Sequence, residues 1–537
     1  MSVTRIENAV VWSGLADPAT GAFAESDAVA FDRAGILALG DEARSLSADT
    51  VIDAAGGFVC SAFRDGHVHA LPGGLERALA PVRGHSSPRE VAAAVGRWAR
   101  DHPEVEWVRG EGFDPSLAPG GIFHAAWLDA EVPDRPAALR ATDYHTVWVN
   151  SEALRRVGYG TGTPQPHDGE IVRDEQGRPI GTLREWGAWR PVYDLLPPMT
   201  RDQALDALAV ASANFAAAGI AWVQEAWVEP QDVAWWLAAA DEGVLGFRAD
   251  LGLWCDPNTW REQLAGFVAS RDRVAAAAGG RLSATTVKFF ADGVIESGTG
   301  AMLEPYCDGP HSTGLPNWDR EELNEAVAAV DALGFSPHIH AIGDAAVRMA
   351  LDAVGHADHV NGPRDRRATI AHAQLVDPAD IERFAGLGVI ANFEPYWAQY
   401  DDAQVELTAP RLGEDRTRRQ YLMRTILDTG ARISFGSDWP VTTHEPLAGI
   451  RVAVTRQGSA SDDPWMPAER LTVEQALAAY TSGVAHQAGD ARGGVLRAGA
   501  RSDVVLLAHD PRRVPPLAIE DIRVLGTWCD GHRVHGE

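Results

Sequence analysis

The sequence predicts an α/β protein with a (β/α)8 TIM-like barrel and a small β-sandwich domain built from both termini. Two patterns predict the barrel: short apolar runs end in polar residues, and Ala/Leu-rich stretches with helical spacing lie between these runs. Such alternation is typical of βα units in a parallel sheet. A third pattern predicts the second domain, because β-branched and aromatic runs punctuated by Gly and Asp occur near both ends.

The terminal β domain is predicted from matching runs at the two ends of the chain. The first end contains IENAVVWSG and AVAFDRAGILALG, and the last contains GVLRAGARSDVVLL and IRVLGTWCDGHRVHG. We therefore expect residues 1–60 and 488–537 to form one β-sandwich around a barrel of residues 61–487.

The barrel strands are expected in runs such as TTVKFFADG, FSPHIHAIGD, RATIAHAQLV and ARISFGSDWPV. In such barrels the chemistry lies at the C-terminal ends of the strands, where the polar residues of these runs fall. About one βα unit separates His340 from His372, but the stretch from His69 to Lys288 is far longer than three units need. A large insertion at about residues 75–200 would account for the excess.

Composition narrows the class of protein. The chain has 537 residues and a formal net charge of −28, which disfavours nucleic acids and anionic membranes as partners. Its four cysteines form no CxxC pair, which fits a reducing compartment. We find no signal peptide pattern and no run of 18 apolar residues. The default expectation is a cytoplasmic enzyme with a small-molecule substrate.

The sharpest local signal is the His67-Val68-His69 pair after Asp65. Residues i and i+2 of a strand point to the same side, so both imidazoles can meet one metal ion. A chance pair is the alternative, since the chain has 18 histidines and repeats the pattern at His338 and His340.

Four more residues extend this pair to a constellation. His340, His372 and Asp438 each end a strand-like run, and Lys288 lies inside an apolar one. A lysine in such a strand must lose its charge, find a partner or be modified. Pairing with a nearby carboxylate, Asp292 or Glu225, is the open alternative.

The order of motifs resembles the amidohydrolase superfamily, and within it the YtcJ-like branch of the amidohydrolase-3 group. The resemblance covers nearly the whole chain. The branch that the chain resembles includes enzymes of the N-substituted formamide deformylase type. It is carried by WVRGEGFD, LRATDYHTVWVNSEAL, VKFFADGVIESGTG, HAIGDAAV, AHAQLV, FGSDWPV and LTVEQALAAYTSGVAH.

The resemblance implies roles for particular residues. The implied metal ligands are His67, His69, Lys288, His340, His372 and Asp438. Lys288 corresponds to a lysine that is carboxylated in many superfamily members and bridges two metals. His338 is outside the usual ligand positions and is expected to be structural, and His145 is expected either to reach the substrate or to pack in a turn.

Two departures from the family pattern stand out. The segment before the first histidine pair, Ser61–Asp65, carries the charged Arg64 inside a strand. The residue before the histidine of strand six is Ala371, where the family often has glutamate. The first departure predicts an unusual start of the first barrel strand, with the metal ligands intact. The second puts in doubt a side-chain contact to the histidine of strand six, but not the metal.

The expected function is hydrolysis of a non-peptide C–N bond of a small molecule by metal-activated hydroxide. One or two divalent ions, with zinc expected, would supply the Lewis acid, and Asp438 would act as general base. If Lys288 is not carboxylated, a single-metal site on the four histidines is expected instead. The same barrel acting on an ester, lactone or ring C–N bond, and a non-catalytic binding relative, are the alternatives.

The tryptophans suggest the kind of substrate. Trp227, Trp397 and Trp439 follow apparent strand ends, where they could form the wall of a pocket for an apolar or aromatic molecule. The alternative is that they pack between barrel and helices. By analogy with relatives, a homodimer is also an expectation.

Overall fold

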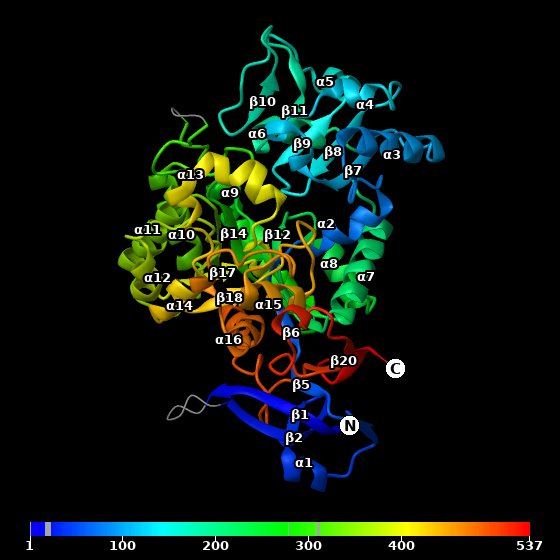
Figure 1. Ribbon diagram of the computed structural model, residues 1–537, viewed down its shortest axis with the longest axis vertical. Helices are drawn as coiled ribbons and strands as arrows, with labels where there is room; N and C mark the ends of the chain where they lie inside the picture. The colour runs from blue at the N-terminus through cyan, green and yellow to red at the C-terminus, as the bar shows by residue number, and fades with distance from the viewer. Residues whose placement is uncertain (1, 17–22, 278, 309–311, 537) are drawn as a thin grey trace.

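Eight parallel strands form a nearly closed barrel at the centre of the molecule (Figure 1). The computed structural model describes residues 2–16, 23–277, 279–308 and 312–536. Neighbouring strands pair in chain order, as a (β/α)8 barrel requires. The strands are β6 (Phe63–Val68), β12 (Ile220–Val228), β13 (Arg248–Trp254), β14 (Leu282–Phe290), β15 (Ser336–Ala341), β16 (Thr369–His372), β17 (Ile390–Phe393) and β18 (Ile433–Phe435).

Helices join the successive strands. Thr200 begins α7 with a capping box, in which its hydroxyl accepts the Gln203 N–H and the Gln203 side chain bonds back. Within the described residues, no helix is long and apolar enough to cross a membrane. The helices from α7 onward are α7 (Arg201–Ala217), α8 (Val233–Asp241), α9 (Trp260–Ala277), α10 (Arg320–Ala332), α11 (Asp344–Asn361), α12 (Ile381–Leu387), α13 (Ala409–Thr417), α14 (Met423–Asp428), α15 (Pro446–Thr455), α16 (Val473–Ala478) and α17 (Val484–Gln487).

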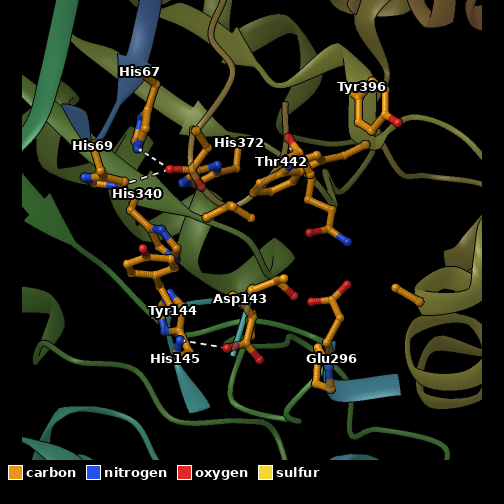
Figure 2. A pocket seen from close by; sticks show the side chains of 18 of the residues that line it. His67, His69, Asp143, Tyr144, His145, Glu296, His340, His372, Tyr396 and Thr442 are labelled. Atoms are coloured by element: carbon orange, nitrogen blue, oxygen red, sulfur yellow. Dashed lines mark hydrogen bonds and ion pairs between the residues drawn. The ribbon is translucent and has the colours of Figure 1, made fainter. Parts of the chain in front are cut away.

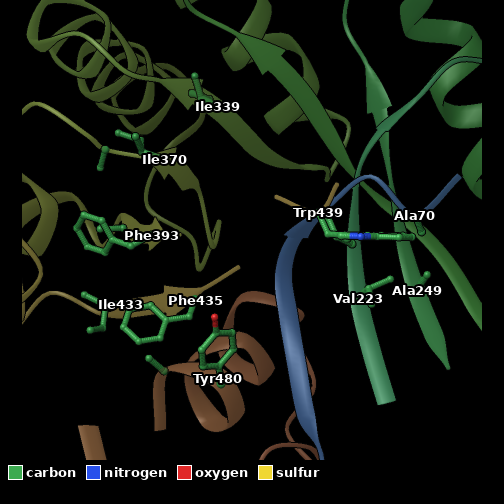
Figure 3. Packing of buried hydrophobic residues seen from close by; sticks show 14 of the residues in the cluster. Ala70, Val223, Ala249, Ile339, Ile370, Phe393, Ile433, Phe435, Trp439 and Tyr480 are labelled. Carbon is green, nitrogen blue, oxygen red and sulfur yellow. The ribbon is translucent and has the colours of Figure 1, made fainter. Parts of the chain in front are cut away.

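Alternation along the strands separates the core from the polar interior. In β15, Ile339 lies between His338 and His340, so it points to the opposite face from both. Ile339 pairs in register with Ile370 of β16, and both are fully buried in the main hydrophobic cluster (Figure 3). This apolar layer fixes the strands, and thereby the histidines on the other face.

The barrel closes through loop backbone rather than through a regular ladder. The N–H groups of Ser437 and Asp438, just after β18, donate to the carbonyl oxygen of His67 at 3.2 and 2.8 Å. The first and last strands are thereby joined at their C-terminal ends. This closure brings Asp438 beside the histidine pair of β6.

A separate five-stranded sheet lies within the span predicted to be an insertion. Its strand order is β10-β11-β9-β8-β7, and Figure 1 shows it at the end of the molecule opposite to the termini. The domain limits themselves remain a prediction. The elements are β7 (Val108–Phe113), β8 (Ala137–Ala141), β9 (Thr146–Val149), β10 (Glu170–Arg173), β11 (Pro179–Arg184), α3 (Pro88–Asp101), α4 (Ala125–Asp129), α5 (Ser151–Val157) and α6 (Trp186–Tyr193); α2 (Ala70–Leu75) precedes them.

Strands from both ends of the chain share one sheet, as the terminal patterns predict. Val505 of β19 pairs with Cys60 of β5, so the two ends are hydrogen-bonded neighbours. Whether this sheet forms a sandwich stays a prediction. Its strands are β1 (Thr4–Ala16), β2 (Phe23–Asp32), β3 (Gly35–Leu39), β4 (Thr50–Asp53), β5 (Phe58–Ser61), β19 (Val504–Leu507), β20 (Val524–Cys529) and β21 (His532–His535), with α1 (Gly40–Ser45).

The charged residue in the first barrel strand has partners. Arg64 is fully buried and donates to Asp490 at 2.7 Å, with Asp503 at 3.4 Å. Asp503 also accepts hydrogen bonds from the buried Arg248 of β13. The charged residue at the start of the first barrel strand is therefore part of an ion-pair network between the barrel and the C-terminal segment.

Breaking this network should destabilise the fold. We expect Asp503→Asn to lower the free energy of unfolding by roughly 3 kcal/mol at pH 7, because two buried guanidiniums each lose one of their two carboxylate partners. The two arginines lower the pKa of Asp503, despite its burial, to about 2. This stabilisation is present above the unfolded-state pKa of about 4 and is lost as the pH falls toward 2.

Urea unfolding of the wild type and the variant between pH 7 and pH 3 measures the difference. Asp428→Asn, which removes an exposed pair with Arg424, is the control and should change stability by less than about 1 kcal/mol. Equal stabilities of Asp503→Asn and the wild type at pH 7 would contradict the role of the network.

Candidate metal centre

His67, His69 and Asp438 converge at the C-terminal mouth of the barrel. Figure 2 shows the two histidines of this group side by side. The Asp438 Oδ1 atom lies 3.0 Å from His69 Nε2 and 3.6 Å from His67 Nε2. All three side chains are buried, and their ligand atoms lie within 4.8 Å of one another. The geometry therefore offers one ion two imidazole nitrogens and a carboxylate oxygen.

His340 and His372 lie next to this group. The His372 ring centroid is 4.7 Å from that of His67 and 4.5 Å from that of His340. Figure 2 shows the four histidines grouped together, with Tyr144 and His145 beside them. The structure thus brings the predicted histidines and Asp438 to one place, although their ligation of a metal stays a prediction.

Lys288 completes the predicted set. It is fully buried in β14, and its Nζ atom lies 3.3 Å from His67 Nε2. Within the described part of the chain it forms no ion pair, so the alternative of pairing with Asp292 or Glu225 is not observed. Burial lowers the pKa of its ammonium group to about 7, even though nearby carboxylates favour the charged form.

Lys288 is also the only lysine in the sequence; every other residue among the 47 lysines and arginines is arginine. Arginine cannot be deprotonated in a protein and does not react as a free amine.

A carboxylate, a histidine and a backbone carbonyl each contact a ring nitrogen of one of these histidines. His372 Nδ1 contacts Glu394 at 2.8 Å, and His67 Nδ1 lies 2.9 Å from His338 Nε2. His340 Nε2 lies 3.1 Å from the carbonyl oxygen of Gly293. His338 therefore supports His67, in agreement with the structural role expected for it.

Glu394 was not predicted from the sequence. It occupies the end of β17, one strand beyond His372, and provides a carboxylate near the place where Ala371 leaves none. Its position directly after the apolar run IANF was the available signal, because polar residues at barrel strand ends are candidates for the site.

Two of the predicted metal ligands have a strained backbone. His372 has φ 72° and Asp438 has φ 51°, values that non-glycine residues rarely adopt. Such a conformation costs on the order of 1–3 kcal/mol and persists only where surrounding contacts hold it. For Asp438 that contact is the hydrogen bond from its N–H to His67.

The donor set fits a divalent metal such as zinc. Asp438 Oδ1 and His69 Nδ1 are buried and have no hydrogen-bond partner within the described structure. Burial lowers the pKa of His67 and His340 well below 6.5 and that of His372 to about 3, so these rings are neutral and can donate a lone pair. A divalent cation would find in Asp438 Oδ1 a carboxylate ligand beside these ring nitrogens.

A cavity of about 400 Å³ opens over the centre. Trp227 and Trp397 line it, and so do Trp186 and Trp189, which were not predicted. Trp227 lies inside β12 rather than beyond its end.

Trp439 is not among the lining residues. It is buried and packs against Phe215 and His444, and its ring fills the space beside Gly73. The structure thus does not show Trp439 on the cavity wall where it is expected, because its ring packs toward Phe215 of α7.

His145 reaches the same cavity from the five-stranded sheet. Its ring centroid is 5.3 Å from that of His340, and its Nδ1 atom lies 2.8 Å from Glu185. Burial disfavours the imidazolium, but Glu185 and Asp143 outweigh it and raise the pKa of His145 to about 9. Thr299 donates to the other oxygen of Glu185, which fixes the pair. Of the two expectations for His145, the geometry favours a position within reach of a substrate.

Comparison with known proteins gives a consistent result. A family model described as "Amidohydrolase family" matches residues 50–535. The chain is 27% identical to the putative amidohydrolase YtcJ of Bacillus subtilis, over 88% of each chain. It is also 27% identical to the N-substituted formamide deformylase of Arthrobacter pascens, over 95% of this chain and 94% of that protein.

Among solved structures, an uncharacterized metal-dependent hydrolase from Pyrococcus furiosus superposes with a TM-score of 0.71 at 24% identity. The alignment covers 95% of this chain and all of that one. At this identity the likeness shows the shared fold.

Proposed function

This chain belongs to the amidohydrolase family, and from that premise we propose that it hydrolyses an amide-type C–N bond of a small molecule with a divalent metal held at the barrel mouth. The predictions of the superfamily and of a hydrolase are confirmed by the family match. The observation that carries the proposal is the convergence of Asp438 Oδ1 with the ring nitrogens of His69 and His67, which lie 3.0 and 3.6 Å away.

The residues present suggest how an ion, most simply zinc, would be held. His67, His69 and Asp438 would hold one ion, and His340 and His372 a second, with a carboxylated Lys288 between them. When bound, the metal would lower the pKa of water and polarise the scissile carbonyl. Without carboxylation of Lys288, one ion on the four histidines is the simpler arrangement.

The chain's own residues would carry the proton and orient the substrate. Asp438 would accept a proton from the attacking water and deliver it to the leaving nitrogen as the C–N bond breaks. Glu394 and His338 hold the rings of His372 and His67 in place. His145, oriented by Glu185, would contact the substrate on the side of the five-stranded sheet.

The cavity lining supports a neutral or aromatic substrate over an anionic one. Its walls include Trp186, Trp227, Trp397 and Phe290. Among the described lining residues there are several carboxylates but no lysine or arginine. A substrate carboxylate would therefore meet like charge and find no cation of the protein other than histidine.

A substrate panel tests the proposed function. We expect the metal-loaded protein to hydrolyse N-benzylformamide, and the 4-carboxylate analogue with at least about tenfold lower kcat/KM, because a desolvated like-charge contact costs on the order of 1–2 kcal/mol. Release of the amine is measured with and without a chelator. Turnover of charged analogues alone would contradict the apolar pocket, and the absence of turnover of any amide would contradict the function.

A further inference from the structure

A second cavity shares two walls with the metal-site cavity. Its volume is about 270 Å³, and Trp189 and Trp227 line both cavities. Leu71 and Leu75 of α2, together with Met199, form an apolar part of its lining. None of the predicted metal ligands lines this second cavity.

Arg140 gives this cavity an unpaired positive charge. It is 5% exposed and lies in β8 of the five-stranded sheet. Glu111 is its register partner on β7, yet that carboxylate accepts hydrogen bonds from Arg109 at 2.9 Å and Tyr144 at 3.1 Å instead. Within the described structure Arg140 has no ion-pair partner, and its buried Nε atom has no acceptor.

Aromatic rings surround the Arg140 guanidinium. Its carbon lies 4.2 Å from the ring centroid of Tyr193, 4.5 Å from that of Trp189 and 5.2 Å from that of Tyr144. Cation–π contacts offset part of the cost of burying the charge, and the Tyr193 hydroxyl is close enough to favour it. Apart from the Tyr193 hydroxyl, no acceptor for the guanidinium is found among the described residues, and no carboxylate pairs with it. The planar fork of N–H donors matches a carboxylate.

The other two arginines of the cavity lining are paired with carboxylates, and Arg109 pairs with Glu111. Arg190 donates to both oxygens of Glu229, at 2.9 and 3.2 Å, and to Asp194 at 2.8 Å. Burial, with the neighbouring Glu229, raises the pKa of Asp232 to about 7, so its negative charge is weakened. Arg140 is thus the cation of this lining that lacks a carboxylate among the described residues.

We propose that this cavity is a binding site for a small carboxylate with an apolar body, held by Arg140 and distinct from the metal centre. The carboxylate would take the free N–H donors of the guanidinium, and the body would lie against Leu71, Leu75 and Met199. The two cavities differ in their cations: the described lining of the metal-site cavity has no arginine, whereas the second cavity has Arg140. A ligand here would press on Trp189 and Trp227, the walls that both cavities share.

Calorimetric titration with phenylacetate and its neutral isostere phenylacetamide tests the site, and it needs no turnover. We expect the metal-loaded wild type to bind phenylacetate at least about tenfold more tightly than phenylacetamide, as a charge-assisted hydrogen-bonded pair provides. Arg140→Met should abolish this preference, and Arg140→Lys should keep only part of it because an ammonium lacks the planar fork. Arg155→Gln, at an exposed position of α5, is the matched control and should bind as the wild type does.

A carboxylate can also bind a metal, so the position of the ligand must be seen. Crystals soaked with 4-bromophenylacetate should show a bromine anomalous peak between Leu75 and Tyr193, and this test does not depend on the variants folding. Equal affinity of the wild type for the acid and the amide would overturn the proposal. So would wild-type binding of phenylacetate by a folded Arg140→Met, or a bromine peak at the metal centre alone.

Discussion

Replacing Asp438 with asparagine should lower kcat by roughly 10³-fold. The variant keeps the size of the side chain but removes the base that accepts the water proton, and positioned general bases contribute about 10²–10⁴-fold. It also replaces a carboxylate ligand by a neutral amide, so the affinity for metal should fall. Both effects follow from one atom, the Oδ1 oxygen that faces His67 and His69.

The experiment compares kcat, kcat/KM and bound metal in the two proteins. Asp428→Asn, on the exposed face of α14, controls for the loss of one negative charge and should retain full activity. If Asp438→Asn bound metal normally and kept more than about a tenth of the wild-type kcat, Asp438 would not be the base.

Replacing Lys288 with alanine should abolish binding of a second metal ion and most of the activity. The expectation rests on a buried lysine 3.3 Å from His67 that forms no ion pair among the described residues, where a carboxylated side chain would supply a bridging anion. Lys288→Arg distinguishes the effect of the positive charge from the effect of carboxylation, because arginine remains cationic but cannot become a carbamate. Both variants should therefore hold at most one ion per chain, measured by elemental analysis.

The single lysine makes the modification directly observable. Protein labelled with ¹³C-lysine and supplied with ¹³C-bicarbonate should show one carbamate carbon resonance, which Lys288→Arg should lack. Undiminished metal content and activity in Lys288→Ala would contradict the bridging role and favour a single ion on the four histidines.

Sequence periodicity predicts the barrel because successive side chains of each strand point to opposite faces. His67 and His69 alternate with Val68, and Ile339 alternates with His338 and His340, so one face is polar and the other is core. The strand ends then locate His340, His372 and Asp438. None of these inferences requires knowledge of contacts between distant segments.

The remaining features depend on such contacts. Glu394, directly after β17, contacts His372 of β16, and Glu185, directly after β11, contacts His145, which precedes β9. Trp439 follows a strand end as Trp397 does, yet a local turn sends it into the core beside Gly73. Arg140 is one of many arginines in the sequence, and only the fold shows that its register partner Glu111 is already engaged.

The central claim is that metal is held at the barrel mouth by His67, His69 and Asp438. Crystals of the protein grown with zinc, with diffraction data collected on both sides of the zinc absorption edge, test it most directly. The account predicts an anomalous peak within coordination distance of those three side chains, and a second peak near His340 and His372 if Lys288 is carboxylated. A fully loaded protein whose anomalous peaks lie away from these residues would contradict it.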